Sequence, residues 1–307
     1  MINRIKYKKL PKHLRERWSY DDYLAYRMQE MSIDQIESVA TPEELWECEK
    51  VLNDDAFRDI FNDKQRFYEK FHIDAQGKYI GRGILFLPGA SEQELHDFCI
   101  RHERVVIKPP DMYAGIGICV TDGETAFGKL INELRNGSGG CSSQRYVVEE
   151  YVNQADEYNR IYPSSLNTVR VTTFIGDDGK PGILFAVNQF GQRGSLVDND
   201  DDTSIWSAID TESGIVVAAD IDDKSGFIYD MHPDTGVKIV GFRNPMWERI
   251  RELALELAMV VPECRLVGWD IAVTEDYSLE LIEGNVTPEL DLYQRISGNG
   301  LRYRLGM

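Results

Sequence analysis

The sequence predicts an α+β protein with three parts. Residues 1–103 carry helix-start signals and few strand patterns, whereas residues 104–152 alternate strand, turn, helix and strand patterns. Residues 153–307 are dominated by short β-rich runs separated by loops. This order indicates a mostly helical N-terminal segment, a small α+β lobe and a larger lobe built on a sheet.

Length and composition are typical of a soluble globular protein. The 307 residues allow one large or two ordinary domains, and 42% are hydrophobic and 28% charged. No apolar stretch approaches the length of a membrane-spanning helix, and no signal-peptide core follows the basic start of the chain. We therefore expect a cytoplasmic protein.

The charge distribution excludes one class of function and leaves another open. A net charge of −18 disfavours nucleic-acid binding, because neutralising phosphates requires clustered cations. Residues 1–17 nevertheless hold seven Lys and Arg residues against one acid. This basic start could contact an anionic membrane surface or substrate carrier, or it could be an ordinary solvated segment. The five scattered cysteines form no CxxC pair, which argues against a zinc cluster or a disulfide framework.

Capping signals place two helices in the N-terminal segment. Thr41 precedes Pro42 and Glu44, so the threonine is expected as N-cap and the proline as the first helical residue. Ser91 followed by Glu94 predicts a second helix that ends near Glu103.

The small lobe contains a candidate phosphate site. Its predicted elements are a strand over 104–108, a glycine turn over 111–117, a returning strand over 116–120, a helix over 125–136 and a strand over 145–152. Lys108 ends the first strand, and Gly115 and Gly117 follow in the turn. A lysine suits a phosphate as a point charge, and glycines let backbone N–H groups approach its oxygens. An ordinary hairpin turn explains the same residues about as well.

The last strand of this lobe carries a candidate adenosine site. Backbone groups of the segment Glu149, Glu150, Tyr151 and Val152 could hydrogen-bond an adenine edge. Glu157 could accept from the ribose hydroxyls. The alternative is an exposed strand end with solvated acids.

The third part alternates strands and loops and ends in a helix and a hairpin. Strands are predicted over 168–175, 183–188 and 215–221, and a helix is predicted after Asn244, with this asparagine as cap and Pro245 at its first position. Arg170 lies inside the first of these strands, where its guanidinium must pair or serve a site. A purely structural Arg–Asp pair is the alternative.

A strand–turn–strand unit near the C-terminus brings three oxygen donors together. Asp270 lies in the strand 268–274, Glu283 and Asn285 lie in the strand 279–285, and the polar turn 275–278 joins them. Mg²⁺ takes such oxygen ligands and is usually completed by substrate phosphates. The three residues therefore predict a magnesium site, although Asp and Asn at strand ends are also common turn formers.

Taken in this order, the motifs resemble those of the ATP-grasp superfamily. Their residues are similar to those of its sugar-transfer-associated branch, which is related to proteins of teichuronopeptide synthesis. The match runs from about residue 60 to 295. The residues that carry it are Asn62–Lys64, Val106–Pro109, Glu149–Val152, Ser165–Arg170, Val197–Asn199, His232–Pro233, Gly268–Asp270 and Ile282–Asn285.

The resemblance implies an ATP-grasp fold with a small lid lobe over 104–152 and a large lobe over 153–307. ATP would be grasped between these lobes. By resemblance, Lys64 and Lys108 hold phosphates, and Arg170 stabilises the transferring phosphoryl group. The metal ligands Asp270, Glu283 and Asn285 hold two Mg²⁺ ions. The remaining implied ATP contacts are the glycine turn, the segment 149–152 and Glu157.

The implied chemistry is ligation of a small carboxylate to a small amine. The carboxylate attacks the γ-phosphate of ATP and becomes an acyl phosphate, which the amine displaces to give an amide, ADP and phosphate. A small-molecule kinase and a non-catalytic ATP-binding module in polysaccharide assembly are the alternatives. The acidic run Asp200–Asp202 replaces a glycine-rich stretch of relatives, and either a cationic acceptor or an acidic surface loop explains it. The oligomeric state stays open, with a homodimer as one alternative.

Overall fold

The computed structural model describes residues 2–73, 81–87, 90–110, 117–136, 145–195, 204–221 and 229–307. The chain divides into two compact units, one made of Met1–Phe57 with Gln154–Met307 and the other of Arg58–Asn153. The predicted segment 1–103 therefore contributes to both units. The predicted glycine turn at 111–116 and the acidic run 200–202 lie outside the described residues.

The unit 58–153 contains a four-stranded antiparallel sheet in the order β1–β4–β2–β3. The strands are β1 (Gly83–Phe86), β2 (Val105–Lys108), β3 (Cys119–Thr121) and β4 (Tyr146–Glu150). Its helices are α7 (Lys64–Phe71), α8 (Glu92–Arg101) and α9 (Gly123–Asn136), and α6 (Asp55–Asn62) crosses the boundary between the units. The predicted strands and helix of this lobe are present in the expected order as β2, β3, α9 and β4, with β4 ending at Glu150.

Alternation along β2 separates the core of this unit from its charged face. Val105 and Ile107 are buried in one cluster with Leu95 of α8 and Leu130 of α9. Because successive side chains of a strand point to opposite faces, Lys108 points away from the face that α8 and α9 cover.

The unit formed by 1–57 and 154–307 is built on a six-stranded antiparallel sheet in the order β10–β9–β5–β6–β7–β8. The strands are β5 (Thr168–Ile175), β6 (Pro181–Phe190), β7 (Ile205–Ile209), β8 (Val216–Ile221), β9 (Leu266–Val273) and β10 (Leu279–Asn285). Together with the smaller sheet, this confirms the predicted α+β class. The predicted range of the first strand, 168–175, matches β5.

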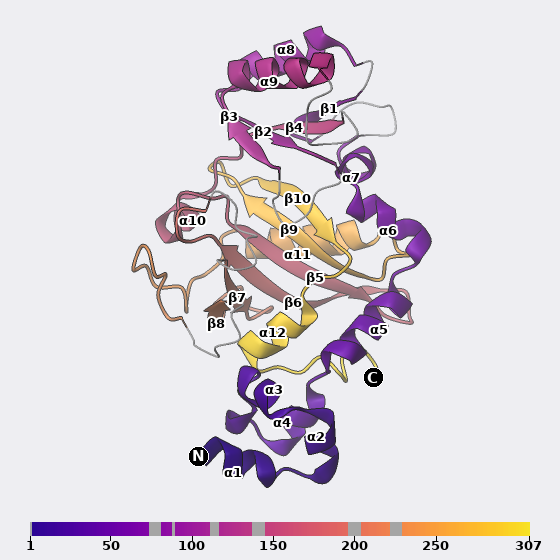
Figure 1. Cartoon of the computed structure of the whole chain (residues 1–307), viewed down its shortest axis with the longest axis vertical. Helices are drawn as coiled ribbons and strands as arrows, with labels where there is room; N and C mark the ends of the chain where they lie inside the picture. The colour runs from indigo at the N-terminus through magenta and orange to yellow at the C-terminus, as the bar shows by residue number, and fades with distance from the viewer. Residues whose placement is uncertain are drawn as a thin grey trace. The chain divides into compact units, whose positions relative to one another are not determined.

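Two helices cover opposite faces of this large sheet. The helix α11 (Trp247–Ala258) packs on β5, β6 and β9, and α12 (Leu290–Ser297) packs on β7 and β8. In Figure 1, α12 lies in front of the sheet and α11 behind it. The ring of Tyr293 in α12 stacks on Phe185 of β6, with 4.3 Å between ring centroids. Phe185 opposes Thr172 in the sheet, so α12 lies on the face that Thr172 and Arg170 share.

Short helices at the N-terminus pack around their own aromatic cluster, which includes Trp18 and Tyr23. They are α1 (Ile2–Lys8), α2 (Lys12–Arg17), α3 (Tyr20–Ala25), the 3₁₀ helix η1 (Met28–Glu30) and α4 (Ile33–Ser38). The predicted capping box of Thr41 and Glu44 is present at the start of α5 (Pro42–Leu52). Gln294 of α12 joins these helices to the sheet, because its side-chain amide exchanges hydrogen bonds with the backbone of Ala40, at 2.9 and 3.0 Å.

The predicted cap of α11 is wrong. The helix begins at Trp247, and Asn244 lies outside it with only 2% of its surface exposed. Its side-chain oxygen accepts from the Tyr158 hydroxyl at 2.8 Å and the Asn188 amide at 2.7 Å. The asparagine therefore satisfies buried polar groups of the core instead of capping the helix. The helix α10 (Asp156–Ile161) precedes β5 in the chain and contributes Tyr158 to this core.

Within the described ranges, no helix combines the length and the apolar character that crossing a membrane requires.

Candidate functional site

A row of three charged residues crosses the large sheet. Arg170 of β5 directly opposes Asp270 of β9, which in turn opposes Glu283 of β10. Directly opposed residues of neighbouring strands share a face, so these side chains stand next to one another on the face that α12 partly covers. Asn285 opposes Gly268 and joins the same face. We call Arg170, Asp270, Glu283 and Asn285 the acidic row.

A β-bulge in β10 creates this arrangement. Leu281 opposes Ile271, but the register shifts before Glu283, which then opposes Asp270. In a regular ladder Ile282 would oppose Asp270, and Glu283 would point to the other face. The extra residue therefore turns the carboxylate of Glu283 toward Asp270, as bulges commonly re-aim a side chain beside a functional site.

Asp270 is buried within a dense set of hydrogen bonds. Arg170 donates to both of its carboxylate oxygens, at 2.7 and 2.8 Å, in a bidentate pair. Gln189 of β6 donates to one of these oxygens at 3.2 Å, and Asn285 donates to the other at 3.3 Å. The Arg–Asp pair considered as an alternative is therefore present, and its aspartate is also the predicted metal ligand.

The protonation equilibria in the row reflect crowded negative charge. Burial, and to a lesser extent the nearby Glu283, raise the pKa of Asp270 to about 6, although Arg170 acts in the opposite direction. The pKa of Arg170 is raised above its ordinary value, because the attraction of Asp270, Glu283 and Glu289 outweighs burial. The single guanidinium does not neutralise both carboxylates of the row.

This uncompensated charge fits a divalent cation. Asp270 and Glu283 offer hard carboxylate oxygens, and Asn285 offers an amide oxygen after rotation of its side chain. Across the described parts of the chain, no three His, Cys, Asp or Glu side chains gather as a metal-binding group. A site here would consequently use two acids and one amide, completed by water or by phosphate oxygens.

Two further residues fix the position of Arg170. A Cβ atom at Gly268 would lie 3.2 Å from the Arg170 Cδ atom and 2.8 Å from the Pro288 Cβ atom, so only glycine leaves room for the arginine stem. The guanidinium lies 5.0 Å from the centre of the Trp206 ring in β7, within the range of a cation–π contact.

The unit 58–153 holds a second charged cluster, which we call the lysine cluster. The ammonium of Lys108 lies 2.6 Å from an oxygen of Glu149, and Arg82 donates to that same oxygen at 2.9 Å. Arg82, Lys108 and Glu149 are all largely buried, with side-chain exposures of 3%, 12% and 4%. The two cations hold the pKa of Glu149 down at about 2 despite complete burial. Glu149 therefore stays ionised and fixes the position of Lys108.

His72 borders the lysine cluster as a neutral ring. It stacks on Tyr68 with 4.8 Å between centroids, and its Nε2 atom has no hydrogen-bond partner among the described residues. Burial, together with the positive charges of Arg82 and Lys108, lowers the pKa of His72 to about 4, although Glu149 acts in the opposite direction.

Lys64 is tied to the same part of this unit. It is the first residue of α7, and its backbone N–H donates to the carbonyl of Pro110 at 2.9 Å, two residues beyond Lys108. Asp63 caps the helix by accepting from the backbone of Gln65 and Arg66.

The predicted adenosine residues are found in different environments. Glu149 serves the lysine cluster, Glu150 lies 3.2 Å from a nitrogen of His102, and the Tyr151 ring lies under the Arg104 guanidinium at 3.7 Å. Val152 is 8% exposed and follows the end of β4.

The other predicted ATP contacts are less closely defined. Glu157 belongs to the other unit, where its carboxylate accepts from the Tyr277 hydroxyl at 3.0 Å. Gly117 has a positive φ of 77°, and Gly115 lies outside the described residues. The ligand contacts assigned to all these residues stay predictions.

Sequence reasoning missed Arg82, His72, Gln189 and Trp206. A signal for the first existed, because the apolar run Gly83–Phe86 directly after Arg82 is typical of a short buried strand. The other three are recognisable only once register and packing are known.

Comparisons with known proteins agree with the resemblance inferred from the motifs. A family model described as sugar-transfer associated ATP-grasp matches residues 46–307, which confirms the predicted family. No curated protein shows significant sequence similarity to the chain.

Solved structures with a similar arrangement include three ATP-grasp or ligase-like enzymes. The ATP-grasp ligase PsnB, in complex with a minimal precursor, is 10% identical, with a TM-score of 0.46 over 79% of this chain and 57% of its own. D-alanyl-alanine synthetase A from Vibrio cholerae is 13% identical, with a TM-score of 0.46 over 79% of this chain and 61% of its own. D-cycloserine synthetase DcsG is 17% identical, with a TM-score of 0.46 over 86% of this chain and 78% of its own. The chain thus spans about three fifths of the length of the first two.

Proposed function

This chain belongs to the sugar-transfer associated ATP-grasp family and has the ATP-grasp fold, and on that premise we propose that it is an ATP- and Mg²⁺-dependent ligase. It would join a small carboxylate to an amine through an acyl phosphate and release ADP and phosphate. The product would be an amide, formed by attaching an amino acid to a sugar, a peptide or another amino acid.

The acidic row is the observation that carries this proposal. Three strands present an arginine and two carboxylates side by side, and a bulge in β10 aligns the last of them. Burial first, and the adjacent Glu283 in addition, raise the pKa of Asp270 although Arg170 pairs with it. A binding module without catalysis would not require this arrangement, and a phosphoryl-transfer site would.

In the proposed reaction the chain's own residues supply charge and orientation. Lys108, held by Glu149, and Lys64 would neutralise phosphate oxygens of ATP. Arg170, held by Asp270, would face the developing charge on the transferring phosphoryl group. Mg²⁺ bound by Asp270, Glu283 and Asn285 would supply further neutralisation of the phosphates.

Phosphorylation makes the carboxylate reactive. A carboxylate expels oxide poorly, whereas the acyl phosphate formed by attack on the γ-phosphate has phosphate as its leaving group. The amine nitrogen then forms the C–N bond, the C–O bond to phosphate breaks, and the amine loses a proton.

The test is an ATP-consumption screen on the full chain with Mg²⁺ and pooled amino acids, amines and sugar acids, with nucleotides separated by chromatography. ADP and phosphate that form only when a carboxylate and an amine are both present support the ligase. A phosphorylated product that persists without amine would indicate a kinase, and AMP with pyrophosphate would overturn the acyl-phosphate mechanism. A Glu283→Gln variant in parallel controls for a contaminating ATPase.

A further inference from the structure

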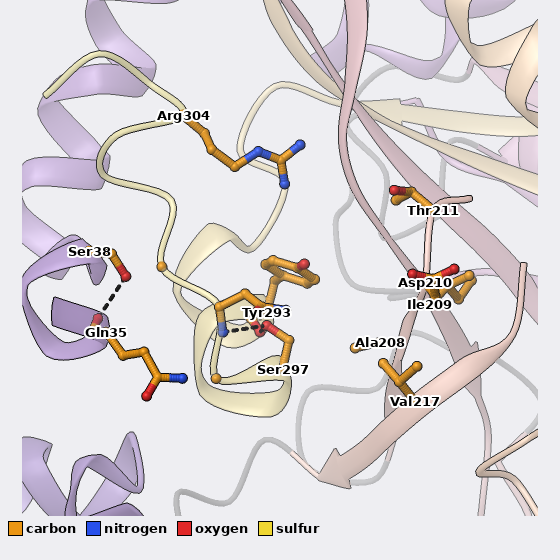
Figure 2. A pocket seen from close by; sticks show the side chains of 13 residues that line it. Gln35, Ser38, Ala208, Ile209, Asp210, Thr211, Val217, Tyr293, Ser297 and Arg304 are labelled. Carbon is orange, nitrogen blue, oxygen red and sulfur yellow. Dashed lines mark hydrogen bonds between the residues drawn. The ribbon is translucent and has the colours of Figure 1, made fainter. Parts of the chain in front are cut away.

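A polar cavity of ≈ 530 Å³ lies at the C-terminal end of α12, within the unit 1–57 and 154–307. Figure 2 shows two walls that face each other across it. One wall carries Gln35 and Ser38 of α4 together with Arg304 from the C-terminal tail, and the other carries Asp210 and Thr211 after β7. Tyr293 lies between the two walls.

The wall formed by α4 and the tail is closely packed. A Cβ atom at Gly300 would lie 2.1 Å from the carbonyl oxygen of Ser38, so the two segments touch backbone to backbone. The Arg302 N–H donates to that carbonyl at 3.0 Å. One guanidinium nitrogen of Arg304 donates to the Ile183 carbonyl at 3.1 Å, and its other N–H groups have no partner among the described residues. Arg304 is exposed, and these remaining donors are available to a ligand.

The opposite wall supplies acceptors. The Asp210 oxygen Oδ1 accepts from the backbone and the hydroxyl of Ser213, at 2.8 and 2.6 Å, and the backbone of Glu212 also donates to this carboxylate. The Ser213 hydroxyl lowers the pKa of Asp210, which therefore stays ionised at neutral pH. Thr211 adds a hydroxyl, and the Trp247 indole N–H holds its carbonyl at 3.2 Å.

An aromatic ring forms part of the floor. Tyr293 is 6% exposed, and Phe185 stacks on it at 4.3 Å, so the ring is held in one orientation. Ala208 of β7 also lines the cavity. Because so little of its surface is exposed, Tyr293 bounds the cavity without presenting a ring face to a ligand.

The lining distinguishes between classes of ligand. An anion such as a phosphate would meet one arginine and, across the cavity, the unneutralised carboxylate of Asp210. An apolar ligand would leave the polar side chains of both walls without partners, which is costly. A neutral polyhydroxylated ring satisfies both walls, since each hydroxyl can accept from Arg304 or Gln35 and donate to Asp210 or Thr211. The volume lies within the range of small-molecule sites and exceeds what one amino acid fills.

We propose that this cavity is a binding site for a neutral saccharide unit, with Arg304 and Asp210 as its opposed polar anchors. The site is distinct from the acidic row. None of the residues that line the cavity belongs to the acidic row. A saccharide bound here would be a separate ligand or the remote part of an extended substrate, and the proposal does not depend on the ligase activity.

The experiment measures saccharide binding to the full chain without ATP, by saturation-transfer difference NMR. The probes are glucose, galactose, N-acetylglucosamine and their β-linked disaccharides at millimolar concentration. We expect ring-proton signals from at least one of them. Two variants remove hydrogen-bonding groups from opposite walls, Arg304→Met and Thr211→Val, and each should weaken that binding about tenfold or more. Arg249→Met changes an exposed arginine of α11 outside the cavity and should leave the binding unchanged.

Three results would overturn the proposal. The first is the absence of signal for every saccharide with folded wild-type protein. The second is saccharide binding that both cavity variants leave unaltered. The third is competition at the same residues by inorganic phosphate or by the zwitterionic dipeptide alanylalanine in place of any saccharide, which would assign the cavity to an anion or a peptide.

Discussion

Glu283 opposes Asp270 across β9 and β10 only because β10 contains an extra residue between Leu281 and Glu283. The bulge places two carboxylates side by side on a face where one guanidinium, that of Arg170, balances them incompletely. Crowding of like charge of this kind disfavours the ionised metal-free state. A bound divalent cation would remove the penalty, so the bulge links the local fold to the proposed cofactor.

The first prediction concerns this carboxylate. Replacing Glu283 by Gln keeps the side-chain volume but removes one negative charge, so the affinity for Mg²⁺ should fall by at least about tenfold, and ATP turnover should fall with it. The fold should survive, since the repulsion on Asp270 is relieved. Mg²⁺-dependent thermal shifts and ATP turnover measure the two effects.

Glu275→Gln serves as its control, because Glu275 is an exposed acid of the hairpin turn that joins the same two strands. This variant should behave like the wild type. Near-normal turnover of Glu283→Gln would remove the metal assignment.

The second prediction uses the space around Arg170. In Gly268→Ala the new methyl group would meet Pro288 and the Arg170 stem, so the guanidinium should shift from its bidentate position on Asp270. Overpacking of this kind typically costs about 1–3 kcal/mol of stability, and we expect turnover to fall further than stability loss alone explains. Chemical denaturation and turnover at a temperature where the variant is folded separate the two effects.

Gly182→Ala provides the matched comparison. It also places a methyl group on a strand of the same sheet, but its nearest neighbour is the Phe174 carbonyl oxygen at 4.0 Å. Equal losses of turnover in the two alanine variants would refute a specific role for the space at Gly268.

The third prediction separates structure from phosphate binding in the lysine cluster. Glu149→Gln leaves Arg82 and Lys108 buried without their shared anion, so stability should fall by about 3–5 kcal/mol. Lys108→Met leaves Glu149 paired with Arg82, so its stability loss should be smaller, whereas its ATP affinity should fall. Urea denaturation and ATP titration provide the two measurements.

The ordering of the two stability losses decides the assignment. If Lys108→Met is the less stable variant and binds ATP normally, the lysine is a structural partner of Glu149 and the phosphate role is refuted.

The sequence predicted the identities of the charged residues better than their partners. The strand–turn–strand pattern predicted that Asp270 lies beside Glu283 and Asn285, whereas Arg170 was recognised only as a charged residue inside a strand, with no particular aspartate named as its partner. Their alignment depends on a register shift in β10 that no local pattern indicates. In the same way, Gln189 and Trp206 reach Arg170 and Asp270 only through the pairing order of the sheet.

The one helix start that was predicted wrongly illustrates the same limit. Asn244-Pro245 is a good local cap signal, as Thr41-Pro42 is, and only the second pair caps a helix. Buried hydroxyl and amide groups of Tyr158 and Asn188 require a partner, and Asn244 supplies it. The need of buried polar groups for hydrogen-bond partners therefore outweighs the preference of asparagine for the N-cap position, which is worth about 1 kcal/mol.

The last prediction is a pH dependence of stability that originates at His72. Its pKa in the folded chain is about 4, below the ordinary value of 6.5, because burial of the ring, together with the cations Arg82 and Lys108 that it faces, outweighs the opposite effect of Glu149. Between these two pH values the unfolded chain binds the proton more readily than the folded chain does. The contribution of the neutral His72 ring to the free energy of unfolding is therefore fully present above pH 6.5. It is lost as the pH falls toward 4, by up to about 3 kcal/mol.

Replacing His72 by Phe tests this dependence. Phenylalanine preserves an aromatic ring beside Tyr68 and removes the Nε2 atom that lacks a partner, so stability near neutral pH should be retained. Urea denaturation across the range from pH 5 to 7 should show a shallower slope in the variant. Glu149 does not interfere, since its pKa of about 2 places its titration below this range. An unchanged slope in His72→Phe would show that the ring is not buried in its neutral form.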